Sequence, residues 1–203
     1  MLSGQQIPPS SKMAAAAEGR AKLSFRNIFV QTQGAYKLRL ALAQKLSHGK
    51  ILKDDAEEIQ ELNILLEKSA DTSLNVSLEC SMALVGLVTE NKIEFNYMLT
   101  KFLNILPSTS NKSGIIHAVT SLLLLQIDLL EHRHGVYKCP YGIGSHPHPF
   151  ITILKNNPES GHLLIEKVGA VLNKTYGTQD TNQIFKMMKP FLLFILGDPR
   201  SST

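Results

Sequence analysis

Apolar side chains recur every three or four positions from residue 24 almost to the end of the chain. This spacing is that of one face of an α-helix. The clearest stripe consists of Val76, Cys80, Ala83, Leu84 and Leu87. No segment alternates apolar and polar residues in the manner of a half-buried strand. The pattern therefore predicts an all-α protein.

Polar turn residues, glycines and prolines divide this pattern into separate helices. The first helix is expected over residues 25–47 with Ser24 as its N-cap, and the second is expected to begin at Asp54 and Asp55. The later helices are expected after residues 71–72, at 95–106, 113–132 and 149–156, from 157 to 177, and at 184–195. Pro190 lies inside the last helix and is expected to bend it or to start a new turn.

Consecutive helices with short connections favour stacked antiparallel pairs, which build a core from contacts between neighbours. We therefore expect an α-α superhelix, a short fragment of a helical-pair solenoid of the HEAT/armadillo type. Asp71 and the stripe that begins at Val76 are spaced like the second helix of a HEAT repeat, although Ser77 replaces the usual basic residue. The expected domain covers residues 24–198, between a disordered leader at 1–23 and a tail at 199–203.

Composition narrows the class of protein. The chain has 203 residues, of which 43% are hydrophobic, so it can bury a core of ordinary size. Two cysteines cannot form a disulfide framework, and no secretory signal opens the sequence, so a cytoplasmic location is expected. The longest apolar stretch, 115–130, is too short and too polar for a transmembrane helix. Peripheral membrane association stays open.

Charge is distributed unevenly along the chain. Residues 1–53 contain nine basic side chains and one acidic side chain, whereas residues 54–94 contain two basic and ten acidic ones. We expect these neighbouring segments to form ion pairs across their helices. An alternative is RNA binding through Lys37, Arg39 and Lys45 on the first helix. Nucleic acid is disfavoured because the basic residues lack interleaved aromatic side chains.

A second alternative is a metal-binding module on the segment 132–148. His132, His134, Cys139, His146 and His148 crowd into this stretch, and imidazole and thiolate are ligands of zinc. The spacing fits no regular zinc module, so we expect a structural turn and no metal or other cofactor. The chain also lacks G-x-S-x-G and H-E-x-x-H motifs, and no enzymatic activity is expected.

The last predicted helix carries a dense apolar run, Phe191 to Ile195. A solenoid that ends on such a face has no polar cap, so we expect either that another chain covers it or that the sequence is the start of a longer protein. The irregular His-Pro-His-Pro segment is a second candidate surface. The candidate protein-contact residues are therefore His146, His148, Met187, Met188, Phe191 and Phe194. Core packing of the apolar residues is the alternative.

Three segments carry a resemblance to a known family. They are Ile93–Thr109, His146–Leu154 and Pro190–Leu192, and their order and spacing also resemble that family. Over about residues 25–198, the chain resembles the N-terminal region of the focadhesin family. Residues 1–23 match nothing in it, and 131–144 depart from its pattern.

The resemblance implies a non-enzymatic role, since focadhesin-like proteins are very large helical-repeat proteins of the cell interior. It implies that this chain is the first part of such an array, as a fragment or a short isoform. The implied partners are vinculin at focal adhesions and components of the superkiller RNA-decay complex. No motif of this sequence localises either contact.

Overall fold

The computed structural model describes residues 9–46, 51–55, 58–133, 148–175 and 182–197. Within these residues the chain forms α-helices, two short 3-10 helices and no strand, which confirms the all-α prediction. The α-helices are α1 (Pro9–Leu23), α2 (Ile28–Lys45), α3 (Gln60–Ser69), α4 (Leu74–Thr89), α5 (Phe95–Ile105), α6 (Ser113–Arg133), α7 (Pro149–Asn156), α8 (Gly161–Thr175) and α9 (Asn182–Ile195). The 3-10 helices are η1 (Leu106–Ser108) and η2 (Pro158–Ser160).

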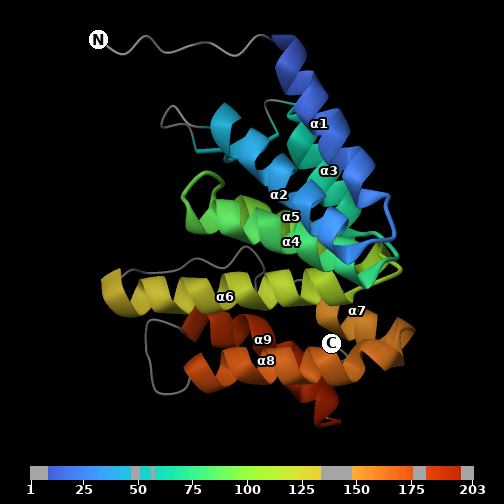
Figure 1. The fold of residues 1–203 in the computed structure, drawn as a ribbon. Coiled ribbons are helices and arrows are strands. Elements are labelled where there is room, and N and C mark those ends of the chain that lie inside the picture. Colours follow the sequence, from blue (N-terminus) through green and yellow to red (C-terminus); the bar gives the residue numbers. More distant parts are fainter. Residues whose placement is uncertain (1–8, 47–50, 56–57, 134–147, 176–181, 198–203) are drawn as a thin grey trace.

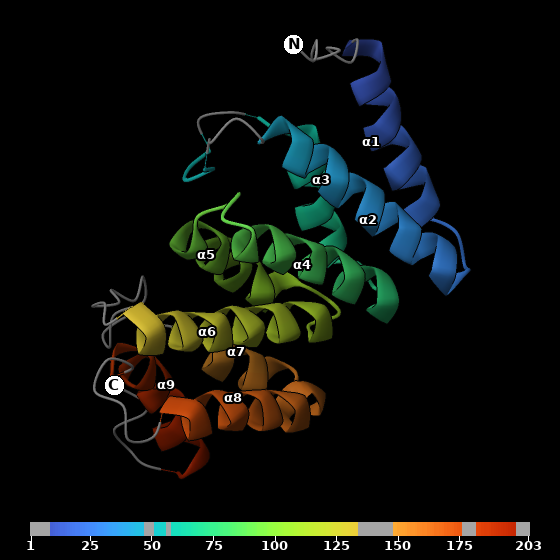
Figure 2. The same cartoon turned by 60° about the vertical axis from the view of Figure 1, so that its left-hand side comes forward.

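Four helices lie side by side in a row. Helix α2 packs on α4, α4 packs on α6 and α6 packs on α8, as Figures 1 and 2 both show. The helices α3, α5 and α9 pack against α4, α6 and α8 respectively. Sequential helices therefore alternate between the row and the elements that cover it. None of the helices in the described ranges is both long and apolar enough to cross a bilayer.

Buried apolar side chains form one continuous core that extends from α1 to α9. Its largest fully buried members include Leu38 of α2, Leu84 of α4, Phe102 of α5, Phe150 of α7 and Phe191 of α9. Because every layer contributes to the same core, each helix is stabilised mainly by its packed neighbours rather than by its intrinsic propensity.

The expected disordered leader is wrong for the part of it that the structure describes. Residues 9–23 form α1, which packs against α2 with Ala16 and Leu23 buried. The helices approach closely because Gly19 and Gly34 face each other at the crossing. The sequence pattern gave no sign of this contact, because glycine is a poor helix former and α1 carries only a short apolar stripe. Residues 1–8 lie outside the described part.

The predicted starts of the first two helices are also wrong. The N-cap of α2 is Asn27, whose Oδ1 accepts a hydrogen bond of 2.9 Å from the Phe29 N–H. Ser24 instead closes α1, since its hydroxyl donates to the carbonyl oxygen of Ala21 at 2.7 Å. Helix α3 begins only at Gln60, directly after Ile59, whose backbone is extended. Farther upstream, buried Leu52 forms an isolated parallel bridge with Ile93.

The later helices follow the predictions more closely. The helices expected at 113–132 and 149–156 correspond to α6 and α7, and Pro190 does lie inside α9. Helix α5 ends at Ile105, and the chain continues as η1. The helix expected from residue 157 starts at Gly161, after η2. The expected tail lies outside the described residues.

Candidate protein-interaction surface

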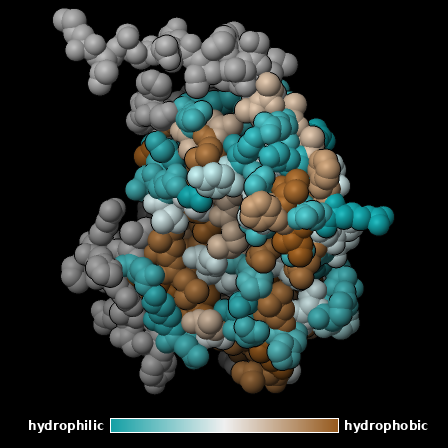
Figure 3. Space-filling model, in the orientation of Figure 1, coloured by the Kyte–Doolittle hydropathy of each residue, from teal (hydrophilic) through white to brown (hydrophobic). Residues whose placement is uncertain are grey.

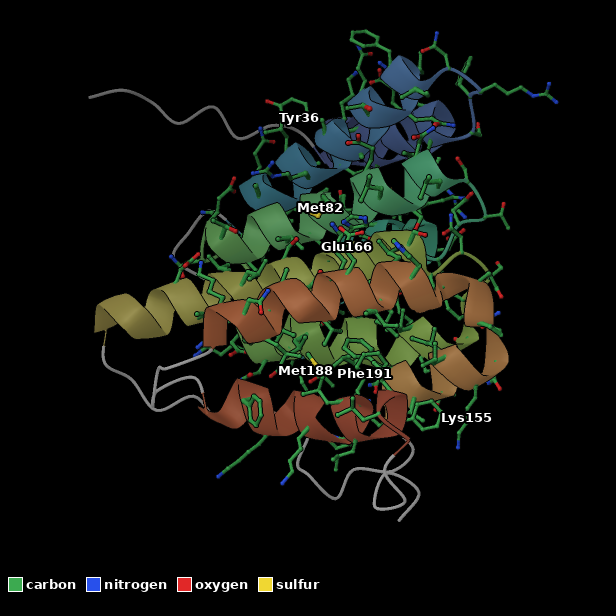
Figure 4. The ribbon with its side chains drawn as sticks, turned by 90° about the horizontal axis from the view of Figure 1, so that it is seen from below. Tyr36, Met82, Lys155, Glu166, Met188 and Phe191 are labelled. Atoms are coloured by element: carbon green, nitrogen blue, oxygen red, sulfur yellow. The ribbon has the colours of Figure 1, made fainter. Side chains whose placement is uncertain are left out.

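Exposed large apolar side chains lie on both of the neighbouring helices α2 and α4: Ile28, Phe29, Tyr36 and Leu40 on α2, and Leu74 and Met82 on α4. Tyr36 and Leu40 of α2 are 56% and 42% exposed, and Met82 of α4 is 38% exposed. Tyr36 and Leu40 are one helical turn apart, so they share a face. Figure 4 shows Tyr36 and Met82 on the side of the molecule away from α9. We call Tyr36, Leu40 and Met82 the α2–α4 face.

A paired arginine borders this face. Arg39 of α2 reaches across to α4 and forms an ion pair with Glu90. Its guanidinium lies over Gly86, where a Cβ atom would be 2.8 Å from Arg39 Cζ. Glycine at this position therefore lets the planar guanidinium rest on the helix backbone. Glu90 therefore neutralises the positive charge of Arg39 beside the α2–α4 face.

The other basic residues of α2 are paired in the same way. Lys37 pairs with Glu18 of α1, and Lys45 Nζ lies 2.6 Å from Oε2 of the buried Glu61 on α3. The predicted pairing of the basic and acidic segments is therefore confirmed for Arg39 with Glu90 and for Lys45 with Glu61, whereas Glu18 belongs to the basic segment itself. The RNA-binding alternative required Lys37, Arg39 and Lys45 as free cations, and the structure gives each of them an acidic partner.

Farther along the row, α6 and α8 carry polar and charged side chains. His117 of α6 lies near Glu166 and Lys167 of α8, which pair with each other at 3.0 Å. Burial lowers the pKa of His117 below its usual value of 6.5, and the charge of Lys167 lowers it further. Hydropathy therefore varies across this side of the molecule, as the mixture of brown and teal in Figure 3 shows.

The predicted contact residues of the last helix do not form an exposed apolar surface. Met188 and Phe191 are fully buried, and the Phe191 ring meets the Phe150 ring edge to face, with their centroids 5.7 Å apart. Figure 4 shows both residues on the inner side of α9. Phe194 is partly buried beneath the Lys155 ammonium, which lies 5.3 Å from its ring centroid. The expectation of exposure is wrong for Met188 and Phe191, because both lie in the core, where Phe191 packs against Phe150 of α7. The side chain of Met187 is outside the described part of the structure.

His148 has a structural position at the start of α7. Its Nδ1 accepts a hydrogen bond of 3.2 Å from the Phe150 N–H, so the ring caps the helix. The side chain is buried, with its ring 5.6 Å from that of Phe150. An exposed contact role for His148 is therefore wrong in this structure. His146 lies outside the described residues, within 134–147.

The metal-binding alternative falls mostly on the same undescribed segment. His134, Cys139 and His146 all lie there. Among the residues that the structure does describe, no group of three histidine, cysteine, aspartate or glutamate side chains is placed to hold a metal ion. His148 Nδ1 accepts a backbone hydrogen bond, so this nitrogen is not available as a metal ligand.

Sequence reasoning overlooked the α2–α4 face. Tyr36 and Leu40 belong to a helix with a small apolar stripe, and nothing in the residue pattern shows which of its apolar positions face outward. One feature of the sequence could have indicated this face: α2 has apolar residues on more than one side. A helix of that kind is either buried on several sides or carries an exposed apolar patch.

Comparison with known proteins gives one consistent relationship. The chain is similar to focadhesin from zebrafish (Danio rerio), human and mouse, with 31%, 30% and 29% identity over 182 or 183 residues. These alignments cover 89% of the chain and 10% of each relative, so the chain spans about a tenth of their length. No family model and no solved structure matches it. Over most of its length, the chain is therefore related to the focadhesin family.

Proposed function

We propose that this chain is a non-enzymatic protein-interaction segment, built as a helical solenoid of the HEAT/armadillo type. The row of α2, α4, α6 and α8 would supply a rigid surface, and the α2–α4 face would dock a partner protein. The observation that carries this proposal is the exposure of Tyr36, Leu40 and Met82 on adjacent helices. Aromatic residues and methionine are enriched where proteins meet, and exposed apolar groups of this kind mark contact sites.

The relationship to focadhesin supplies the biological setting of the proposal. We propose that the chain acts as the N-terminal segment of a focadhesin-like protein in the cytoplasm, at focal adhesions. Vinculin is the partner proposed there. Stabilisation of the superkiller RNA-decay complex is proposed as the second role of the same scaffold. Both follow from the family resemblance, and the residues of the chain localise neither contact.

Purified vinculin and purified superkiller complex test the proposal directly. Each would be titrated against the 203-residue chain in a solution binding assay. The double variant Tyr36→Ala/Leu40→Ala removes two exposed contact side chains from the α2–α4 face. Phe185→Ala on α9 is the matched control, because Phe185 is an exposed aromatic residue on a different helix.

Each outcome of this assay decides between alternatives. Binding of one partner that weakens at least about tenfold in the double variant, and remains in Phe185→Ala, supports docking through the α2–α4 face. Binding that both variants weaken equally would place the contact elsewhere. If neither partner binds the unmodified chain, the proposed partners are wrong for this segment.

A further inference from the structure

A polar hollow lies at the edge of the molecule where two helix connections meet. One is the connection from α1 to α2 and the other is the connection from α3 to α4, which lie beside each other in Figures 1 and 2. The hollow has a volume of about 470 Å³. Its lining includes Phe25, Arg26, Gln31, Lys68, Asp71 and Ser73. It is separate from the α2–α4 face, whose three residues do not line it.

Gln31, which lines the hollow, contains a hydrogen-bond acceptor that has no donor. Gln31 is only 7% exposed, and its Nε2 donates to the carbonyl oxygen of Phe25 at 2.6 Å. That hydrogen bond uses the amide nitrogen and fixes the orientation of the amide group, which leaves the amide oxygen Oε1 to be accounted for. Oε1 is buried and accepts no hydrogen bond. Buried polar atoms are nearly always satisfied, so an N–H or O–H group that reaches this oxygen would stabilise it.

The charges of the hollow leave one cation free. Lys68 Nζ and Asp71 Oδ2 lie 3.0 Å apart, and Asp71 Oδ1 accepts from the Ser73 N–H at 3.0 Å. These two charges therefore offset each other. Arg26 is exposed and, within the described residues, its guanidinium has neither an ion pair nor a hydrogen bond. An arginine guanidinium binds a carboxylate through two parallel hydrogen bonds.

An aromatic ring completes the site. Phe25 is 56% exposed next to Arg26, at the mouth of the hollow. A ligand that satisfies all three groups must combine a carboxylate for Arg26, a donor for Gln31 Oε1 and an apolar group for the Phe25 ring. An inorganic anion supplies the first of these and has no apolar group. An extended peptide supplies all three, because its backbone N–H groups alternate with side chains.

We propose that this hollow binds an extended acidic peptide segment of another protein. An aspartate or glutamate carboxylate of the peptide pairs with Arg26, a backbone N–H donates to Gln31 Oε1, and a neighbouring apolar side chain packs on Phe25. This proposal depends on the proposed scaffold role in one respect, which is that the ligand is a segment of another protein. It adds a second contact, on a different edge of the molecule from the α2–α4 face.

Three fluorescent peptides of equal length test the proposal against the 203-residue chain: one alternates glutamate and leucine, one glutamine and leucine, and one lysine and leucine. Fluorescence polarisation measures their binding. The variants are Arg26→Gln and Arg26→Glu, with Arg20→Gln as the matched control. Arg20 is also an exposed arginine, but it pairs with Glu67 at 3.0 Å and does not line the hollow.

The expected result is selective binding of the glutamate peptide. Arg26→Gln should weaken it at least about tenfold, Arg20→Gln should leave it unchanged, and Arg26→Glu should transfer the preference to the lysine peptide. Equal losses in Arg26→Gln and Arg20→Gln would show unspecific attraction and overturn the proposal. Displacement of the peptide by inorganic phosphate at equal concentration would identify a free-anion site instead. Because Arg26→Gln leaves Tyr36 and Leu40 in place, failure here is distinguishable from failure of docking at the α2–α4 face.

Discussion

Gly34 of α2 lies so close to Gly19 of α1 that a Cβ atom at position 34 would be 2.8 Å from the Gly19 carbonyl oxygen. The same Cβ would be 3.0 Å from Lys22 Cβ. The obstacle at Gly19 is backbone, which cannot move aside as the end of a long side chain can. This crossing holds α1 against the rest of the molecule, and it makes α1 part of the fold.

Gly34→Ala is therefore expected to destabilise the protein, by about 1–3 kcal/mol of unfolding free energy. Urea denaturation measures this loss, and hydrogen exchange should show faster exchange in α1. Gly169→Ala is the matched control, because a Cβ at position 169 meets no atom within 4 Å. Alanine is the better helix former, so the control should gain up to about 1 kcal/mol. Equal responses of the two variants would contradict the tight crossing.

The ion pair between Lys45 and Glu61 joins α2 to α3. Glu61 is fully buried and its Oε1 accepts no hydrogen bond, whereas Lys45 is partly exposed. Lys45→Met would leave the Glu61 carboxylate buried without its counter-charge. We expect a loss of about 2 kcal/mol, between the values for exposed and for buried pairs. Thermal and urea unfolding measure it.

Two further variants isolate the charge from the packing. Lys37→Met removes a lysine of the same helix whose partner, Glu18, is exposed, and it is expected to leave the melting temperature unchanged. The double variant Lys45→Met/Glu61→Gln removes both charges and should be more stable than Lys45→Met alone. If the double variant is the less stable one, the buried charge is not the cause of the loss.

Helix existence and type could be predicted from the sequence, because the apolar stripes of α4, α5 and α6 recur with helical spacing. Helix starts were harder, because capping depends on geometry. Ser24 and Asn27 are both suitable N-caps by composition, and only the path of the chain leaves Ser24 to close α1.

The direction of the apolar side chains could be predicted where they form one stripe, as in α4, but not where a helix carries apolar residues on several sides. Phe191 and Tyr36 are both aromatic residues on helices with apolar neighbours, yet one is buried and the other exposed. The difference arises from the packing of α7 and α9, which are far from α2 in the chain. The pairing of charges was predictable as a tendency, since oppositely charged segments follow each other, but the individual partners were not.

Phe191→Ala and Tyr36→Ala should therefore behave differently. Phe191 fills the core against Phe150, so its truncation leaves a cavity and should cost about 3–5 kcal/mol. Tyr36→Ala should leave the unfolding free energy nearly unchanged. Chemical denaturation compares the two variants under identical conditions. A stable Phe191→Ala protein that loses partner binding would instead restore Phe191 as a contact residue.

His117 makes stability depend on pH below its usual pKa of 6.5. Burial holds the pKa of His117 below 6.5 in the folded state, so the unfolded chain binds the proton more readily. The contribution of His117 to stability is complete above pH 6.5 and decreases as the pH falls through the folded pKa. The carboxyl groups of Glu18 and Glu166 also have lowered pKa values, but their contributions are lost only below their usual value of 4.5.

The unfolding free energy is therefore expected to fall as the pH is lowered below 6.5, and His117→Gln should reduce that slope. His162→Gln is the matched control, because His162 lies on the exposed side of α8 and its replacement should preserve the slope. Urea denaturation at a series of pH values gives both slopes. Because the remaining histidines are common to the two variants, the difference between them isolates the buried imidazole. A slope that His162→Gln reduces as much as His117→Gln would show that burial of His117 is not its source.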